Sequence, residues 1–212
     1  MMTEPNKLAA LTFDDGPNTT TTPQMLDKLA KHGVTASFFL VGDNITEQSA
    51  AVVRRAFEMG CEIGCHGKTH SAMPNLTDDE VKAEIRFTND KITQITGTPP
   101  QFFRPPYIAV GGGMYESIDM TFVAGIGAED WLDEVSADMR AKRILSKVRD
   151  GSIILLHDMS GNYRTADALD IIIPSLKRQG YELVTVSELF KRKNIVPIRG
   201  RVYSNVFQET EY

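Results

Sequence analysis

Four groups of polar residues in this 212-residue sequence have side chains that could hold a metal ion or transfer protons. They lie at residues 14–15 (two aspartates), 66–70 (a histidine at each end), 104–107 (RPPY) and 157–158 (HD). Each group follows a short apolar run of the kind that forms a buried strand. In a parallel β/α fold, the carboxyl ends of the strands lie on one face, where active sites form. We therefore expect the four groups to meet there.

The histidine pair and the aspartate pair together have the composition of a catalytic metal centre. His66 and His70 are four positions apart, so both imidazoles would lie on one face if the segment makes a helical turn. Asp14 and Asp15 point to opposite sides of an extended strand, so one could bind a cation while the other remains free as a base. Two histidines and one carboxylate leave room for water on the ion. The alternatives are a chance pair of surface histidines and a capped turn at the two aspartates.

Further residues could assist catalysis. His157 follows four apolar residues and could protonate a leaving group if a carboxylate orients it; the alternative is a buried core histidine. Arg104 begins a loop stiffened by two prolines and could hold a carboxylate, or it could be an ordinary surface charge. Asp130 adds a carboxylate beside Trp131, the only tryptophan, which could be an exposed sugar platform or a core residue. His32 is expected to end a helix and to have no catalytic role.

The composition limits the classes of protein to consider. Hydrophobic residues make up 42% and charged residues 24%, which is typical of a globular domain, and the net charge of -5 argues against nucleic acid as a partner. Cys61 and Cys65 would lie about 13 Å apart in a strand, too far for a disulfide, so both are expected to be reduced. Three residues separate them, whereas a haem-attachment motif needs two. No apolar run reaches about 18 residues, so we expect no membrane span.

Strand-like and helical segments alternate along the chain. The expected strands are residues 8–13, 36–41, 61–65, 102–103, 152–156 and 181–186, and the expected helices are residues 23–31, 49–59, 77–95, 136–148 and 165–178. This alternation predicts a parallel sheet with right-handed crossovers. Six or seven such units predict a barrel or an open doubly wound sheet. No repeat or linker divides the chain, so one domain is expected.

The motifs in combination resemble those of the polysaccharide deacetylases of the NodB-homology type, carbohydrate esterase family 4. Five motifs stand in the family's order, at residues 12–17 (TFDDGP), 66–70, 104–107 (RPPY), 130–131 (DW) and 155–157 (LLH). The resemblance implies an α/β fold, a single-domain distorted (β/α) barrel with about seven units and parallel strands. The motif-bearing core would span about residues 7–190. Residues 191–212 would form an extension that is either ordered or frayed.

The resemblance also implies which residues form the metal centre and the catalytic base. Asp15, His66 and His70 look like the ligands of one divalent cation. Zinc is the first expectation for this ligand set, and cobalt or nickel would also fit. Asp14 looks like the catalytic base, and Arg104 looks like the residue that tethers it.

The remaining motif positions match the family's acid and its substrate pocket. His157 looks like the general acid, oriented by Asp130. Trp131 and Leu155 would line the pocket for the acetyl methyl group, and the Tyr107 backbone N–H would stabilise the oxyanion.

Two positions depart from the family pattern. Gly67 stands where a serine or threonine usually braces the histidine loop, which places metal affinity in question. Ile108 stands where glycine is common and could narrow or reshape the substrate groove.

The implied function is divalent-metal-dependent hydrolysis of acetyl groups on a poly- or oligosaccharide. N-acetylglucosamine units of chitin-like oligomers or peptidoglycan are the preferred substrates, and O-acetylated xylan is the alternative for the same centre. A different class of alternative is an inactive sugar- or metal-binding relative. The presence of Asp14, Arg104 and His157 argues against it, because binding alone needs neither base nor acid.

The sequence bears less directly on the oligomeric state and on the cellular compartment than on the function. We expect a monomer that binds no nucleic acid and has no membrane span. The first seven residues contain no apolar signal core. This fits a cytoplasmic protein, or a secreted or cell-surface protein from which an export signal has been removed.

Overall fold

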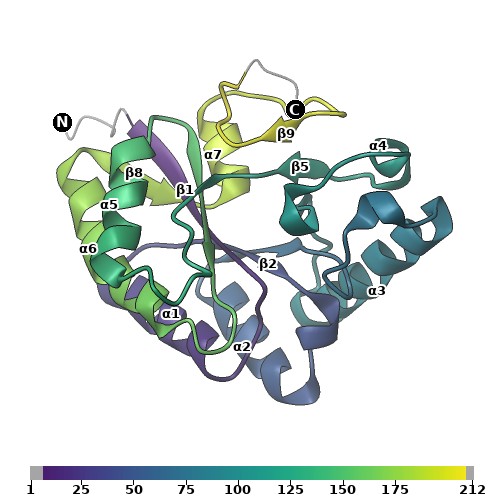
Figure 1. Cartoon of the computed structure of the whole chain (residues 1–212), viewed down its shortest axis with the longest axis horizontal. Coiled ribbons are helices and arrows are strands. Elements are labelled where there is room, and N and C mark those ends of the chain that lie inside the picture. The colour runs from purple at the N-terminus through teal and green to yellow at the C-terminus, as the bar shows by residue number, and fades with distance from the viewer. Residues whose placement is uncertain (1–6, 209–212) are drawn as a thin grey trace.

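The computed structural model describes residues 7–208, in which strands and helices alternate as predicted (Figure 1). The strands are β1 (Lys7–Asp14), β2 (Ser37–Leu40), β3 (Glu62–Cys65), β4 (Phe102–Phe103), β5 (Thr121–Val123), β6 (Ile126–Gly127), β7 (Ser152–His157), β8 (Tyr181–Val184) and β9 (Val202–Tyr203). The α-helices are α1 (Thr21–His32), α2 (Glu47–Glu58), α3 (Asp78–Thr96), α4 (Met114–Ser117), α5 (Ala137–Lys147), α6 (Tyr163–Arg178) and α7 (Val186–Arg192). Residues 1–6, where no signal core is expected, and residues 209–212 lie outside the described part.

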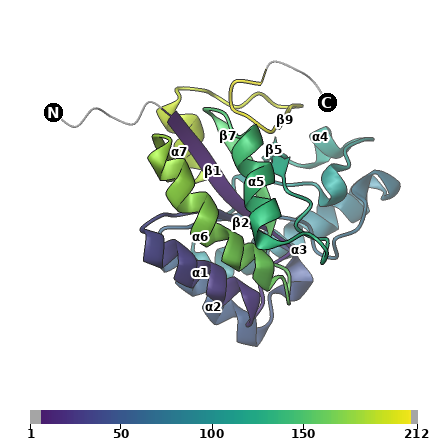
Figure 2. The same ribbon diagram turned by 60° about the vertical axis from the view of Figure 1, so that its left-hand side comes forward.

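The strands form one curved parallel sheet with the order β6-β7-β1-β2-β3-β4-β5-β9, and β8 pairs with the first half of β1. Helices α5, α6, α1, α2 and α3 contact one another in that order, and Figures 1 and 2 show α5, α6, α1 and α2 as a layer over the sheet. Right-handed parallel crossovers produce this arrangement. The prediction of a distorted (β/α) barrel is confirmed.

Strand β1 alternates between two buried environments, and this alternation points its functional residues inward. Leu11 and Phe13 belong to the core beneath the outer helices, whereas Ala10 belongs to a second core that α7 and the C-terminal segment help to close. Side chains on one face of a strand repeat every two residues, so Thr12 and Asp14 share the inner face with Ala10. Both are buried at the carboxyl end of the strand.

Capping residues determine where the helices begin and end. Thr77 and Glu80 form the predicted capping box at the start of α3, in which Glu80 accepts a hydrogen bond from the Thr77 N–H at 2.8 Å. Gly97 ends that helix with a left-handed φ of 74°. A second capping box, between Thr46 and Ser49, was not predicted and starts α2 two residues before the expected position.

The C-terminal part of the chain differs most from the sequence prediction. The last predicted strand ends at Val184, because Thr185 accepts a hydrogen bond from the Glu188 N–H and caps α7, a helix that was not predicted. The extension is ordered as far as residue 208. Within it β9 pairs with β5, and the following residue, Ser204, accepts a hydrogen bond from the Ile153 N–H at 2.9 Å. The extension therefore links β5 to β7.

Two expectations from the composition can be compared with the structure. Cys61 and Cys65 are both buried and free, as predicted. Burial raises the pKa of the Cys65 thiol to about 12, so this side chain stays protonated at neutral pH. Among residues 7–208, no helix combines the length and the apolar character needed to cross a bilayer.

Candidate metal and catalytic site

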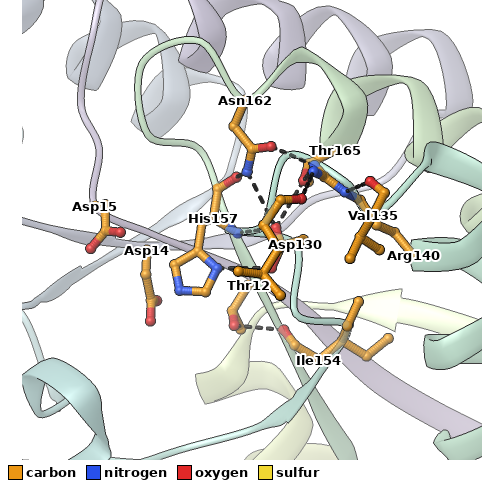
Figure 3. A network of polar contacts seen from close by, with 12 residues as sticks. Thr12, Asp14, Asp15, Asp130, Val135, Arg140, Ile154, His157, Asn162 and Thr165 are labelled. Atoms are coloured by element: carbon orange, nitrogen blue, oxygen red, sulfur yellow. Dashed lines mark hydrogen bonds and ion pairs between the residues drawn. The ribbon is translucent and has the colours of Figure 1, made fainter.

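The four polar groups predicted from the sequence meet at the carboxyl ends of their strands. Asp14 is the last residue of β1, and His157 is the last residue of β7. These two residues are direct partners in the parallel pairing of β1 and β7, so they lie at the same level of the sheet (Figure 3). His66 and Arg104 directly follow β3 and β4. The prediction that the four groups converge is confirmed.

Asp15, His66 and His70 place three potential ligand atoms close together. Asp15 Oδ1 lies 3.4 Å from His66 Nε2 and 3.3 Å from His70 Nε2, and all three donor atoms lie within 4.8 Å of one another. Zinc bonds of about 2.1 Å at tetrahedral angles separate neighbouring ligand atoms by roughly 3.4 Å. Asp15 Oδ1 is also buried without a well-aligned hydrogen-bond donor among the described residues. The donor set therefore fits a small divalent cation.

The protonation of these residues also suits a cation. Burial raises the pKa of Asp15, but its contact with His66 and the charges of His66, His157 and His70 outweigh burial and hold the pKa below its ordinary value. Burial and the neighbouring His66 lower the pKa of His70 despite Asp15. His66 Nδ1 lies 2.6 Å from the Arg104 carbonyl, which can only accept. Nδ1 therefore carries a proton, and Nε2 is the nitrogen that faces Asp15.

The loop between the two histidines does not form the helical turn that would place both imidazoles on one helix face. It is irregular, with φ of 79° at Gly67 and 60° at His70. Glu84 on α3 braces it by accepting hydrogen bonds from the two backbone N–H groups that follow Gly67, at 2.8 and 2.9 Å. A Cβ atom at Gly67 would lie 2.6 Å from Met73 Cε. The positive φ at Gly67 strains other residues and suits glycine, and Glu84 supplies the bracing expected of a hydroxyl.

Arg104 holds Asp14 from behind, as the resemblance implied. Its guanidinium is fully buried, so the alternative of a surface charge is wrong. Nη1 donates to Asp14 Oδ1 at 2.5 Å and to Thr12 Oγ1 at 2.8 Å, while Nη2 donates to the Ala124 carbonyl at 2.6 Å. Burial lowers the pKa of Arg104, and the Asp14 carboxylate opposes this effect. The buried cation and the buried anion therefore depend on each other.

His157 is held by Asp130 in the arrangement of an oriented acid. Asp130 is fully buried, its Oδ1 lies 2.8 Å from His157 Nδ1, and its Oδ2 accepts from the His157 backbone N–H at 2.8 Å. Burial lowers the pKa of His157, but the hydrogen bond to Asp130 and the charges of Asp130, Asp14 and Asp15 raise it to about 9. At neutral pH the ring is therefore an imidazolium beside Asp14 (Figure 3).

These groups line a cavity of about 600 Å³ with two aromatic side chains in its wall. Tyr107 is 70% exposed, and its ring meets His70 edge-on at 4.6 Å between centroids. Trp131 is 49% exposed and meets His157 in the same way at 5.4 Å, so it is not a core residue. Leu155 adds an apolar wall. A few polar groups in a partly apolar hollow are typical of a small-molecule site.

Ile108 lies in the same wall with an unusual backbone conformation. Its φ of 52° is in the left-handed region, which is rare for a β-branched residue and free of strain for glycine. The side chain lines the cavity, so it occupies space that a glycine would leave open. The expectation that Ile108 narrows the groove stays a prediction.

Asp158 was part of a predicted group but had no assigned role. It is fully buried, accepts from Thr22 Oγ1 at 2.5 Å and lies against Gly16, where a Cβ atom would come within 2.4 Å of Oδ2. Burial, together with the charges of Asp15 and Asp14, raises its pKa to about 7, although Thr22 opposes the increase. Asp158 therefore supports the turn that carries the aspartate pair. Its contacts with Gly16 and Thr22 join residues that are far apart in the sequence, so no local pattern reveals them.

Every residue predicted for the site lies in the cavity wall or directly behind it. The wall contains Asp14, Asp15, His66, His70, Tyr107, Trp131, Leu155 and His157. Arg104 and Asp130 stand behind the wall, each bonded to the residue that it was predicted to orient. His32 ends α1 and bonds Asp170 at 2.7 Å, in agreement with its predicted lack of a catalytic role.

Comparison with known proteins identifies similar sequences. The sequence profile described as Polysaccharide deacetylase matches residues 2–118. The chain is 46% identical over 205 residues to a bifunctional xylanase/deacetylase of Pseudobutyrivibrio xylanivorans, covering 96% of this chain and 34% of that protein. It is 38% identical over 189 residues to the peptidoglycan-N-acetylglucosamine deacetylase PgdA of Listeria monocytogenes, covering 89% of this chain and 40% of that protein. The chain thus spans well under half the length of these two relatives.

Among solved structures, a family 4 acetyl xylan esterase from Clostridium thermocellum has a similar fold. It superposes with a TM-score of 0.93 at 43% sequence identity, and the match covers 95% of this chain and 100% of that chain. That structure was determined in complex with a cobalt ion.

Proposed function

This chain belongs to the polysaccharide deacetylase family, and on that premise we propose that it hydrolyses acetyl groups from carbohydrate with the help of a bound divalent cation. One observation carries the proposal. Three metal-binding donor atoms, an Arg-tethered carboxylate and an Asp-tethered imidazolium lie around a single cavity. Hydrolysis needs all three parts, whereas binding of sugar or metal alone does not.

Asp15, His66 and His70 would hold the cation, and zinc is the ion that we propose, with cobalt or nickel able to replace it. When bound, the cation would supply Lewis acidity that activates water and stabilises negative charge on the acetyl carbonyl oxygen. The protein holds the donor atoms in the positions and tautomer that binding requires. The Arg104 carbonyl fixes the His66 tautomer, and Glu84 fixes the loop between the two histidines.

Asp14 would accept the proton of the attacking water. One of its oxygens is bound by Arg104 at 2.5 Å, and the other lies 3.8 Å from His66 Nε2 at the edge of the donor set. Arg104 holds this buried carboxylate in a fixed orientation, which a base needs before it can take a proton. The Tyr107 backbone N–H would donate a hydrogen bond to the oxyanion that forms as the water oxygen bonds the acetyl carbon.

His157 would complete the reaction as the acid. Its Nδ1 donates to Asp130, so the Nε2 proton is the one available for transfer. This proton passes to the departing nitrogen or oxygen as the bond from that atom to the acetyl carbon breaks. The products are acetate and the free amine or hydroxyl of the sugar. Trp131 and Leu155 would hold the acetyl methyl group in the apolar part of the cavity.

Two substrate classes follow from this chemistry. We propose N-acetylglucosamine units as the preferred substrate, supported by the likeness to PgdA. A specific observation favours O-acetylated xylan as the second candidate. The acetyl xylan esterase and the xylanase/deacetylase are 43% and 46% identical to this chain, compared with 38% for PgdA.

The test is acetate release from N-acetylglucosamine oligomers and from acetylated xylan, each before and after chelation and again after zinc or cobalt is added. Release that stops with chelator and returns with metal supports the proposal, and the faster substrate decides between amide and ester. Metal-loaded protein that releases acetate from neither substrate would count against deacetylation and favour an inactive sugar-binding relative.

A further inference from the structure

Asp130 accepts hydrogen bonds from more groups than the imidazole that it orients. Its Oδ2 accepts from the His157 backbone N–H at 2.8 Å and from Thr165 Oγ1 at 2.8 Å, and Asn162 Nδ2 lies 3.4 Å away (Figure 3). Asn162 and Thr165 lie at the start of α6, whereas Asp130 follows β6. Neither Asn162 nor Thr165 belongs to a motif found in the sequence.

A buried arginine stands behind this layer. Arg140 on α5 is 1% exposed and donates from Nη1 to Thr165 Oγ1 at 2.8 Å and to Asn162 Oδ1. Its Nε and Nη2 donate to the carbonyls of Val135 and Leu132 at 2.9 and 3.0 Å. Figure 3 shows the chain of contacts from Arg140 through Thr165 and Asn162 to Asp130 and His157.

The chemistry of the guanidinium decides the direction of every hydrogen bond in this chain. Arginine has donors and no acceptor, so Thr165 Oγ1 and Asn162 Oδ1 must both accept from Arg140. The single hydroxyl proton of Thr165 is then left for Asp130. The Asn162 amide can likewise turn only its NH2 group toward Asp130 and toward the His157 carbonyl, which lies 2.9 Å away.

All groups that reach Asp130 Oδ2 are therefore donors, and an ionised carboxylate is the form that accepts from all of them. Oδ1 remains to accept from His157 Nδ1. Without Arg140, the Thr165 hydroxyl would lose the donor that directs its proton toward Asp130, and the Asn162 amide would be oriented only by its bond to the His157 carbonyl. Asp130 would lose donors at Oδ2 and would bind the His157 imidazolium less well.

We infer that Arg140 is a positioning residue for the catalytic acid, which acts through Thr165 and Asn162 to orient Asp130 and, through Asp130, the His157 imidazole. The inference rests on the proposed role of His157 as the acid. It assigns a function in the reaction to a residue on α5 that touches neither the cavity nor the donor atoms of the metal centre.

Other charged groups near His157 must be separated from this effect. Those that face its ring are Asp130, Asp14, Asp15 and His70, and Asp158 follows it in the chain. Arg140 carries a positive charge, so removal of that charge alone would raise the pKa of His157. Loss of the hydrogen bonds to Asp130 would lower it. The two explanations therefore predict opposite signs.

The experiment is a pH titration of the His157 ring by NMR in zinc-loaded, 15N-histidine-labelled protein. Thr165→Val removes the hydroxyl with almost no change of shape or charge, and Arg140→Met removes the guanidinium. A hydrogen bond to a charged group is worth about 1.5 kcal/mol, so we expect T165V to lower the pKa of His157 by about 1 pH unit and R140M to lower it further. The matched control is Arg143→Met, also on α5, whose guanidinium bonds Ala128 and Glu129 instead. In this control, His157 should have the same pKa as in the wild type.

Activity provides the second readout. In T165V, kcat should fall about tenfold at the alkaline end of the pH profile with KM nearly unchanged. A T165V protein that titrates like the wild type, or an R140M protein in which the pKa rises, would overturn the inference. T165V decides the matter alone if R140M does not fold. The NMR result does not depend on turnover, so failure of the deacetylase proposal and failure of this inference remain distinguishable.

Discussion

The ion pair between Arg104 and Asp14 should be the most strongly coupled pair of charges in the site. Both side chains are almost completely buried, at 0% and 3% exposure, and their atoms lie 2.5 Å apart. Replacing Arg104 with methionine would leave an uncompensated buried carboxylate, which costs about 3–5 kcal/mol. Asp14→Asn would leave the opposite problem, a buried guanidinium with no counter-charge, whose partners at Thr12, Ala124 and position 14 would all be neutral oxygens.

The double variant removes both charges, so its loss of stability should be smaller than the sum of the single losses. We expect a coupling energy of about 2–3 kcal/mol in a double-mutant cycle, measured by urea unfolding of the chelator-treated proteins at pH 7. The exposed pair Arg143 and Glu129, 2.6 Å apart, is the matched control. Its coupling should stay below about 1 kcal/mol. If the Arg104 and Asp14 variants are additive within about 0.5 kcal/mol, the mutual dependence of the pair is refuted.

Three further perturbations test other parts of the account. Asp130→Asn should lower the pKa of His157 from about 9 to below its ordinary 6.5, because burial remains and the counter-charge is lost. Since the acid works only when protonated, the pH above which activity is lost should move downward, with a loss of at least roughly thirtyfold at pH 8 in a pH–rate profile. Gly67→Ala should lower both the melting temperature and zinc affinity measured by calorimetry, because of the positive φ and the contact with Met73. Leu11→Ala, in a fully buried position, should cost about 2–5 kcal/mol of unfolding free energy in urea without changing zinc affinity.

The sequence was sufficient to predict those parts of the site that lie at strand ends. Asp14 and His157 follow long apolar runs, so the strands and the shared face could be inferred from periodicity. The histidine loop could not, because its shape depends on a brace from Glu84 on a helix that begins after the loop. The spacing of His66 and His70 is compatible with a helical turn, but the loop does not form one.

Local sequence patterns also could not predict which residues, distant in the sequence, hold the site residues in place. Arg140 is separated by more than twenty residues from the two side chains that it orients, and a charged residue on an amphipathic helix is usually exposed. Strands β5, β6 and β9 have two or three residues each, too few to show a period of two. Their positions follow from pairing with neighbouring strands and not from their own sequence.

The central claim is that Asp14 acts as a base beside a cation held by other residues. The most direct test compares zinc content and acetate release for the wild type and Asp14→Asn, on whichever substrate the wild type hydrolyses. We predict that the variant binds zinc with nearly wild-type affinity and loses at least about a hundredfold in kcat. A zinc-loaded variant that releases acetate at close to the wild-type rate would contradict the account.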